Sequence, residues 1–222
     1  MKYTVGILLL LCGCWCSCDL MEKRERKKCE GEAVLGFEFD IPYSIAPAKD
    51  TFRIGDTIWL ESVFSNQMLN KHNGKTYTLD QFDFRMSGVI LDLQTNPCLP
   101  TTAYDMVSPE SGLYTADRSG NYFYFRYALS NGYYRWRAGF VPKRSGTFAF
   151  LPDTDIDLGN LSGQSPPQRI TACNYEAVTL NILRKNAPSN VYLLQQAADP
   201  YVREPWDIAP FEQTAFAFYV KE

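Results

Sequence analysis

The chain has 222 residues, 45% of them hydrophobic and 21% charged, and this composition excludes an intrinsically disordered protein. Its formal net charge of −3 argues against a general nucleic-acid binder, because such proteins usually carry a basic excess or a basic stripe. Aromatic residues make up 14% of the chain, and together with 14 glycines and 13 prolines they favour short strands and turns over long helices.

The first residues have the features of an export signal. A lysine precedes the apolar run Val5–Leu11, which is too short to span a bilayer as a helix. The following segment, Leu11–Cys14, resembles the lipobox of bacterial lipoproteins. The resemblance implies cleavage before Cys14 and attachment of lipid, palmitate included, to that cysteine. We therefore expect residues 1–13 to be a lipoprotein signal peptide; the alternative is an ordinary signal peptide whose cysteines are incidental.

The next segment, residues 14–32, is predicted to be a lipidated tether. From residue 19 onward it is nearly all charged and shows no apolar stripe, as is typical of a solvated linker. The lipid would hold the protein to a membrane of the bacterial cell envelope. We expect the outer membrane, without a preference for its periplasmic or its surface side.

Beyond the signal, the cysteines are Cys29, Cys98 and Cys173, an odd number for an oxidising compartment. Cys98 and Cys173 are a candidate disulfide pair, which the sequence alone cannot test. None of these cysteines has the spacing of a zinc site, and the chain contains one histidine, so no metal site or cofactor is expected.

The folded body begins near residue 33 with two predicted strands. Residues 36–45 alternate between apolar and polar, which indicates a half-buried strand, and Pro42 places that strand at a sheet edge or a bulge. Residues 56–64 form the next predicted strand. The polar segment 65–80 is interpreted as a loop.

Residues 81–93 are predicted to form a long strand. Its alternation is lost after Gly88, which suggests a bulge at that glycine. Further strands are expected at 147–151, 178–183 and 211–220, a long loop at 153–168, and one short helix at 191–198 that Pro200 ends.

Many short strands, long loops and almost no helix predict an all-β protein. The expected fold is an antiparallel β-sandwich of the immunoglobulin or fibronectin type, elaborated with long loops. Residues 33–222 contain no linker-like break, so we expect one domain there rather than two smaller sandwiches.

Two further segments carry a resemblance to a known group of proteins. RIGDTIWLES at Arg53–Ser62 and YRWRAGFVPKRSGTFAF at Tyr134–Phe150, combined with the lipobox and the charged tether, resemble uncharacterised secreted lipoproteins of Bacteroidota. The resemblance implies a location in the envelope. It brings no assigned activity and no catalytic residue.

The sequence contains none of the common catalytic motifs, such as GxSxG, HExxH or a phosphate-binding loop. The single histidine, His72, is expected to be a solvated loop residue. The alternating acids of Asp153–Asp157 are similar to a calcium loop, but Leu158 and Gln164 occupy the positions where the EF-hand needs glycine and glutamate. A weaker calcium site there is the alternative to a solvated acidic loop. No carboxylate pair can be selected for glycoside hydrolysis.

The stretch from 121 to 141 is the richest in aromatic residues. Asn131–Gly132 favours a two-residue type I′ turn, and this turn sets a single hairpin register for the whole stretch. In that register Phe125 faces Ala138 and Tyr127 faces Trp136 on an apolar side that should be core. On the other side, Arg126 faces Arg137 directly. We call that side the Tyr/Arg face; it contains Tyr122, Tyr124, Arg126, Tyr133, Arg135 and Arg137.

Two interpretations of the Tyr/Arg face compete. In the first, a neighbouring strand supplies acids, with Asp83 and Glu61 as candidates, and the arginines lie over tyrosine rings. In the second, acids are absent and the face binds a glycan, an anionic ligand or a protein, because tyrosine and arginine are enriched at binding hot spots. The sequence thus predicts a non-catalytic envelope lipoprotein that binds or adheres. The alternatives are an accessory carbohydrate-active enzyme and a structural subunit that assembles through an edge strand.

Overall fold

A computed structural model of the chain describes residues 36–80, 82–98, 103–111, 113–116, 122–153, 178–203 and 209–222. The predicted signal peptide, the tether and Cys14 lie outside these ranges, as do Cys173 and all of the acidic stretch except Asp153. Cys98 carries a free and buried thiol. In the described part of the chain, no helix has the length and apolar character needed to cross a membrane.

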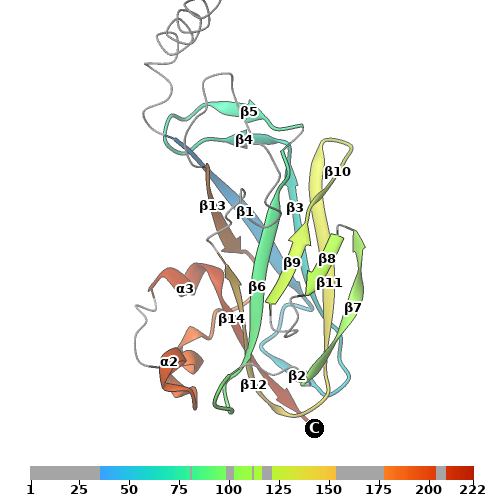
Figure 1. Cartoon of the computed structure of the whole chain (residues 1–222), viewed down its shortest axis with the longest axis vertical. Helices are drawn as coiled ribbons and strands as arrows, with labels where there is room; N and C mark the ends of the chain where they lie inside the picture. Colours follow the sequence, from blue (N-terminus) through green and yellow to red (C-terminus); the bar gives the residue numbers. More distant parts are fainter. Residues whose placement is uncertain are drawn as a thin grey trace, which may run out of the picture.

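The structure consists mainly of two six-stranded sheets (Figure 1). The first sheet has the order β10-β11-β3-β1-β13, and β7 also pairs with β11. Its strands are β1 (Phe37–Ala46), β3 (Ile58–Ser65), β7 (Tyr104–Ser111), β10 (Ala128–Ser130), β11 (Tyr133–Pro142) and β13 (Val178–Arg184).

The second sheet has the order β2-β14-β12-β6-β9-β8. Its strands are β2 (Thr51–Arg53), β6 (Arg85–Asp92), β8 (Leu113–Ala116), β9 (Tyr122–Arg126), β12 (Gly146–Asp153) and β14 (Phe216–Lys221). The predicted antiparallel β-sandwich is confirmed. Two outer pairings, β1 with β13 and β2 with β14, are parallel.

Aromatic side chains from both sheets fill the space between them. Along β1 the predicted alternation holds, and every second residue from Phe37 to Ile45 is buried. Trp136 of β11 is 1% exposed and stacks on Phe125 of β9 in the opposite sheet, with ring centroids 4.4 Å apart. Each large side chain buried in this way contributes about 1.5–3 kcal/mol to stability.

Pro42 does not mark a sheet edge, because β1 lies between β3 and β13. The antiparallel pairing of β1 with β3 covers only residues 44–46. Beyond it, the Ser62 hydroxyl donates a hydrogen bond to the Pro42 carbonyl oxygen at 2.6 Å. The nitrogen of Pro42 points to the same side of β1 as its carbonyl oxygen, toward β3. The hydrogen-bond ladder between β1 and β3 does not extend to Pro42, so the missing N–H breaks no ladder bond in this interior strand.

The predicted loop at 65–80 instead contains a hairpin of β4 (Gln67–Leu69) and β5 (Thr76–Thr78). Its few apolar residues explain the difference, since Met68 and Leu79 are buried in the core. The fully buried Asn70 fixes the hairpin to the start of β1, because its side-chain oxygen accepts a hydrogen bond from the Glu38 amide at 3.1 Å. Figure 1 shows this hairpin at the end of the sandwich where β1 begins.

Gly88 forms no bulge, since the register of β6 with β12 and β9 runs through it without a shift. A β-carbon at this position would lie 2.7 Å from Cε2 of Phe150, so the glycine permits close packing between neighbouring strands. The alternation is lost after Gly88 for another reason. Both faces of β6 are buried there, with Ile90 in the core between the sheets and Leu91 in a second apolar cluster on the outside.

The predicted hairpin at 121–141 is correct only near its turn. Residues 128–130 pair with 133–135 in the expected register. On the N-terminal side of Tyr127 the chain belongs to the other sheet, where β9 pairs with β6 and β8 and not with β11. The amide of Tyr127 donates to the Phe84 carbonyl at 3.0 Å, on the approach to β6. The apolar side faces the core in both sheets, so alternation alone could not reveal the crossing.

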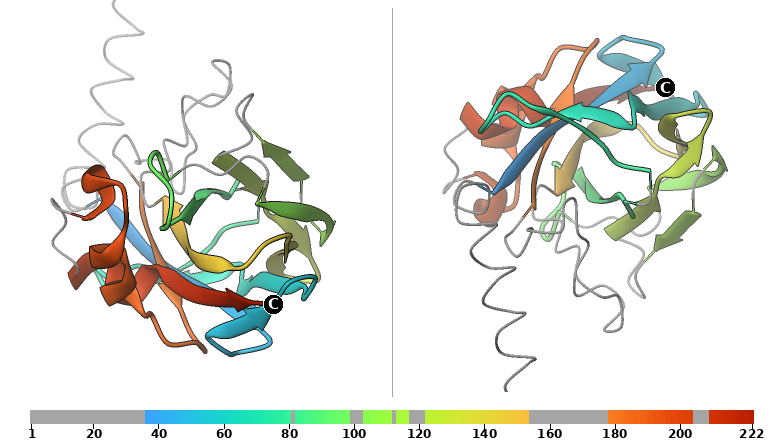
Figure 2. Two further views of the ribbon diagram at one scale, coloured as in Figure 1. Left: turned by 90° about the horizontal axis from the view of Figure 1, so that it is seen from below. Right: turned by 90° about the horizontal axis from the view of Figure 1, so that it is seen from above.

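The C-terminal region contains more helix than expected. The predicted helix at 191–198 is a 3-10 helix, η1 (Val191–Gln196), followed by α2 (Pro200–Arg203) and α3 (Ala209–Thr214). The predicted strand at 211–220 starts only at Phe216, because α3 precedes it. The end-on views of Figure 2 place these helices on the side of the molecule opposite to β7 and β8.

Candidate binding surface

The outer face of β3 and β11 brings together aromatic, apolar and cationic side chains. In both strands alternate residues are buried, so the intervening ones point away from the core. Glu61 lies opposite Arg137 in the register, and Val63 lies opposite Arg135. We call this surface the β3–β11 face; it contains Trp59, Glu61, Val63, Tyr133, Arg135 and Arg137.

Arg137 has an acid partner on this face. Its Nε lies 2.6 Å from Oε1 of Glu61, which confirms one of the two acids predicted to pair with the arginines. Its guanidinium lies 3.8 Å from the ring centroid of Trp59, a cation–π contact. The first interpretation placed the arginines over tyrosine rings, whereas the ring beneath Arg137 is that of a tryptophan. The charge of Arg137 is largely neutralised by Glu61.

Arg126 lies in the other sheet and faces Arg85 in the register, not Arg137. Two arginines, Arg85 and Arg126, therefore do face each other, which is unfavourable by itself, and the carboxylate of Asp83 compensates for it. Asp83 Oδ1 lies 2.5 Å from Nε of Arg126, while Oδ2 accepts a hydrogen bond from Nε of Arg85 at 2.9 Å. The predicted role of Asp83 as an acid partner is thus confirmed.

Arg135 differs from the other two arginines. Its neighbours in the register are Val63 on β3 and Ala128 on β10, neither of which carries charge. Within the described ranges it forms no ion pair. Val63 is 54% exposed and Tyr133 is 48% exposed, so the cation lies among accessible apolar and aromatic surface. A guanidinium offers five N–H donors in a planar fork that matches carboxylate and phosphate groups.

The six residues of the Tyr/Arg face are divided between the two sheets. Tyr133, Arg135 and Arg137 come together on β11. Tyr122, Tyr124 and Arg126 belong to β9 in the other sheet, so the prediction of one continuous surface is wrong. Sequence reasoning missed Trp59 and Val63 as members of the surface. Their signal was present in the alternation of β3, which places both on the same side as Glu61.

His72 is an exposed turn residue, as predicted, and it lies near an acidic group. Its Nε2 is 3.4 Å from Oε2 of Glu38 on the outer face of β1, and its side chain is 40% exposed. Lys71 pairs with Asp40 at 3.1 Å, and the Asn181 amide donates to both carboxylates. Both carboxylates, of Glu38 and of Asp40, are thus held by neighbouring polar side chains. The described residues include no group of three or more side chains arranged to hold a metal.

No protein-family model and no curated protein matches the chain. The human F-spondin reeler domain is similar in structure with 7% identity and a TM-score of 0.30, over 54% of this chain and 79% of that one. A type II cohesin domain from the cellulosome of Acetivibrio cellulolyticus has 9% identity and a TM-score of 0.26, covering 53% and 78%. A conjugative transposon lipoprotein from Bacteroides eggerthii has 10% identity and a TM-score of 0.18, covering 53% and 87%.

These similarities concern the β-sandwich architecture, and at such low identities and TM-scores they carry no argument about ligand or activity. The resemblance to lipoproteins of Bacteroidota stays a prediction from the sequence. The structure itself defines the chain as a β-sandwich. The outer face of its first sheet carries polar and aromatic side chains, and the outer face of its second sheet is buried in an apolar cluster that includes residues of η1.

Proposed function

We propose that this protein is a non-catalytic, lipid-anchored module of the bacterial cell envelope that binds an anionic ligand through the β3–β11 face. The observation that carries the proposal is Arg135, the one arginine of the predicted site without an acid partner among the described residues. Arg137 pairs with Glu61, and Arg126 shares Asp83 with Arg85 in the other sheet. The positive charge that remains on this face is that of Arg135.

The surroundings of Arg135 support a binding role over a structural one. A structural arginine on a sheet surface usually finds a carboxylate on the neighbouring strand, as Arg137 does. Arg135 instead lies beside exposed Val63 and Tyr133. Tyrosine and arginine together are enriched at binding hot spots, where an aromatic ring supplies contact area and the guanidinium supplies directed hydrogen bonds.

The ligand chemistry that fits this surface best is an acidic carbohydrate. A carboxylate of the ligand would meet the guanidinium fork of Arg135, and the ring of Tyr133 would lie against an apolar sugar face. Neutral polysaccharides would lack the charged contact. An acidic peptide shares the carboxylate but not the sugar face, so it serves as the comparison that separates charge from shape.

The test uses the soluble fragment of residues 29–222 with Cys29→Ser, which contains every residue that the structure describes. Binding to polygalacturonate, dextran and polyglutamate is measured by isothermal titration calorimetry at low and high salt. We expect polygalacturonate to bind, with an affinity that falls as salt increases. Arg135→Ala should weaken that binding by roughly tenfold, about 1.4 kcal/mol.

Arg126→Ala is the matched control, because it removes the same side chain from the other sheet. It should leave polygalacturonate binding unchanged. Equal binding of dextran, or full binding by the Arg135→Ala variant, would overturn the proposal.

The lipid anchor is a separate part of the proposal and has its own test. Cys14, in the lipobox-like segment, is the expected attachment site. Cells that express the full chain are labelled with radioactive palmitate. The wild-type protein should incorporate label, and Cys14→Ser should not. Equal labelling of a Cys14→Ser protein would assign the lipid to another residue.

Assembly through an edge strand at Pro42 lacks its supporting observation, because β1 is an interior strand. The neighbouring carboxylates Glu38 and Asp40 do not support the hydrolase alternative, since they are held by Asn181 and Lys71.

A further inference from the structure

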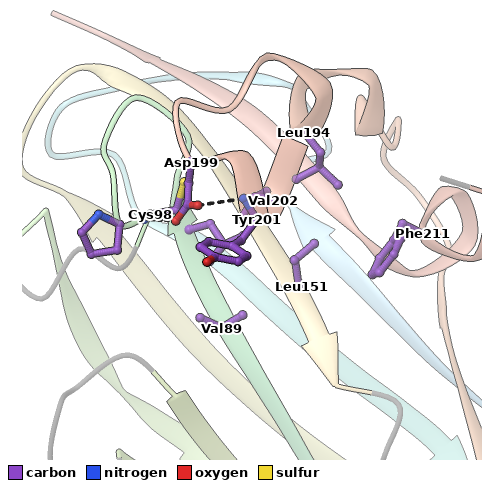
Figure 3. Close-up of a pocket in the computed structure, with 10 residues that line it drawn as sticks. Val89, Cys98, Leu151, Leu194, Asp199, Tyr201, Val202 and Phe211 are labelled. Carbon is purple, nitrogen blue, oxygen red and sulfur yellow. Dashed lines mark hydrogen bonds between the residues drawn. The ribbon is translucent and has the colours of Figure 1, made fainter. Parts of the chain in front are cut away.

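The outer face of the second sheet contains a pocket beneath the C-terminal helices (Figure 3). Its volume is about 290 Å³. An engineered apolar cavity of about 150 Å³ is large enough to bind benzene, so this pocket has room for a ring with a short chain. The lining residues are Val89, Leu91, Pro97, Cys98, Leu151, Leu194, Asp199, Tyr201, Val202 and Phe211.

The pocket exists because the second sheet is apolar on both faces. Leu91, Ala149 and Ala217 point outward and are buried under η1. Next to them, Val89 and Leu151 also point outward, but they are only partly buried. The helical segment therefore covers one part of the apolar outer face completely and leaves a hollow over the neighbouring part.

One charged group lines this apolar pocket. Asp199 is only 7% exposed, and its two oxygens accept hydrogen bonds from backbone amides, Oδ2 from Cys98 at 3.2 Å and Oδ1 from Tyr201 at 2.9 Å. No lysine or arginine in the described ranges forms an ion pair with it. Each carboxylate oxygen has a second lone pair, so the group can accept a further hydrogen bond.

The backbone contacts give Asp199 a structural role, since its carboxylate and its carbonyl oxygen accept hydrogen bonds from backbone amides at the start of α2. They also hold the carboxylate in a fixed orientation at the wall of the pocket. A buried anion whose described partners are neutral amides is best complemented by a cation that brings its own hydrogen-bond donors. An anionic ligand would be repelled by the same group.

We propose that this pocket binds a small organic amine, with its apolar body between β6, β12 and the C-terminal helices and its ammonium group on Asp199. The apolar walls would take up a ring or a short chain by the hydrophobic effect. The site is separate from the β3–β11 face, which lies on the other sheet and is the surface proposed above for an anionic ligand.

Three probes of the same shape test the charge preference on the soluble fragment of residues 29–222 with Cys29→Ser. They are 2-phenylethylamine, 2-phenylethanol and 3-phenylpropanoate, each titrated by ligand-observed NMR at pH 7. The amine should bind at least tenfold more tightly than the alcohol, and the acid should bind most weakly. Acid binding as tight as amine binding, or no amine binding at millimolar concentration, would overturn the proposal.

Two variants locate the site. Leu151→Trp fills the hollow and should abolish amine binding, whereas Leu69→Trp adds the same side chain at an exposed position of β4 and should leave it intact. Asp199→Asn should reduce the preference for amine over alcohol to about one, with alcohol binding retained. If Asp199→Asn does not fold, as judged by circular dichroism, Leu151→Trp decides. Full amine binding by Leu151→Trp would sink the proposal.

Discussion

The outer faces of the two sheets differ in a way that the buried aromatic core does not suggest. On the first sheet, β3 and the first half of β11 alternate between buried residues and outward-facing ones, most of which are charged or aromatic. On the second sheet, β6 presents Leu91 outward, and Leu91 is buried in the apolar cluster that includes residues of η1. One face is thus open, while the other is the floor of a second apolar cluster.

This difference shows how alternation should be interpreted in a β-sandwich. A strand that alternates cleanly, such as β3, has one solvated face. A strand that loses its alternation without a change in register, such as β6 after Gly88, is covered on both faces. The covering element must then come from elsewhere in the chain, and here it is the segment from η1 to α3.

The largest predicted effect concerns the core shared by both faces. Trp136→Ala removes a side chain that is 1% exposed and stacked on Phe125. We expect the free energy of unfolding to fall by about 3–5 kcal/mol, because the substitution leaves a cavity that the surrounding rings cannot fill. Urea denaturation measures the loss. A value near zero would contradict the placement of Trp136 between the sheets.

The comparison of the two outer faces is tested by a pair of substitutions. Leu91→Ala should cost about 2–5 kcal/mol, since Leu91 is 6% exposed beneath η1. Val63→Ala, on the open face, should change stability by no more than about 0.5 kcal/mol. Both values come from the same urea titration. Similar losses for the two variants would mean that the faces are equally covered.

A smaller difference in stability is expected between substitutions of the two ion-paired arginines, Arg137 and Arg126. Arg137→Ala removes the contact with Trp59 as well as the ion pair with Glu61, and it should cost about 1–2 kcal/mol. Arg126→Ala removes a pair whose arginine is 56% exposed, so its cost should stay below about 1 kcal/mol. Thermal denaturation of both variants measures the difference. A larger loss for Arg126→Ala would reverse the assignment.

The smallest effect appears only at alkaline pH. Burial raises the pKa of Tyr134 to about 12, while in the unfolded chain a tyrosine titrates near pH 10. Below about pH 10 the phenol is neutral in both states and its stabilisation is fully present. Between about pH 10 and about 12 the unfolded chain loses the proton first, so the free energy of unfolding falls.

Tyr134→Phe checks this pH dependence. The variant should unfold with a weaker dependence on pH above about 10, and it should lose about 0.5–1.5 kcal/mol at neutral pH with the hydrogen bonds to Leu79 and Phe82. Guanidinium denaturation at a series of pH values gives both quantities. An unchanged alkaline dependence would show that Tyr134 contributes nothing to it.

Local patterns in the sequence predicted most strands and the two acid partners of the arginines. Period-two alternation identified β1 and β3, and the outward position of Glu61 on β3 made it a candidate for Arg137. The sequence could not predict which sheet each strand joins. Alternation specifies a buried side but not a neighbour, so the crossing at Tyr127 was missed, and Arg126 was assigned to Arg137 in place of Arg85.

The candidate surfaces were predictable to different extents. Arg135 and Tyr133 were identified by residue type, and the register around the Asn131–Gly132 turn was correct. The pocket with Asp199 was not foreseen, because its walls come from β6, β12 and the C-terminal helices, which are far apart in sequence. Only the lost alternation of β6 indicated that something covers the second sheet.

The crossing at Tyr127 also affects how the sandwich comes apart. Only this residue separates β9 of the second sheet from β10 of the first, and its amide is bonded to Phe84 on the approach to β6. Sliding of one sheet past the other would break the hydrogen bond of Tyr127 to Phe84 and the stack of Phe125 on Trp136. Fluorescence probes placed in either sheet should therefore report the same midpoint of unfolding, as expected for one cooperative transition.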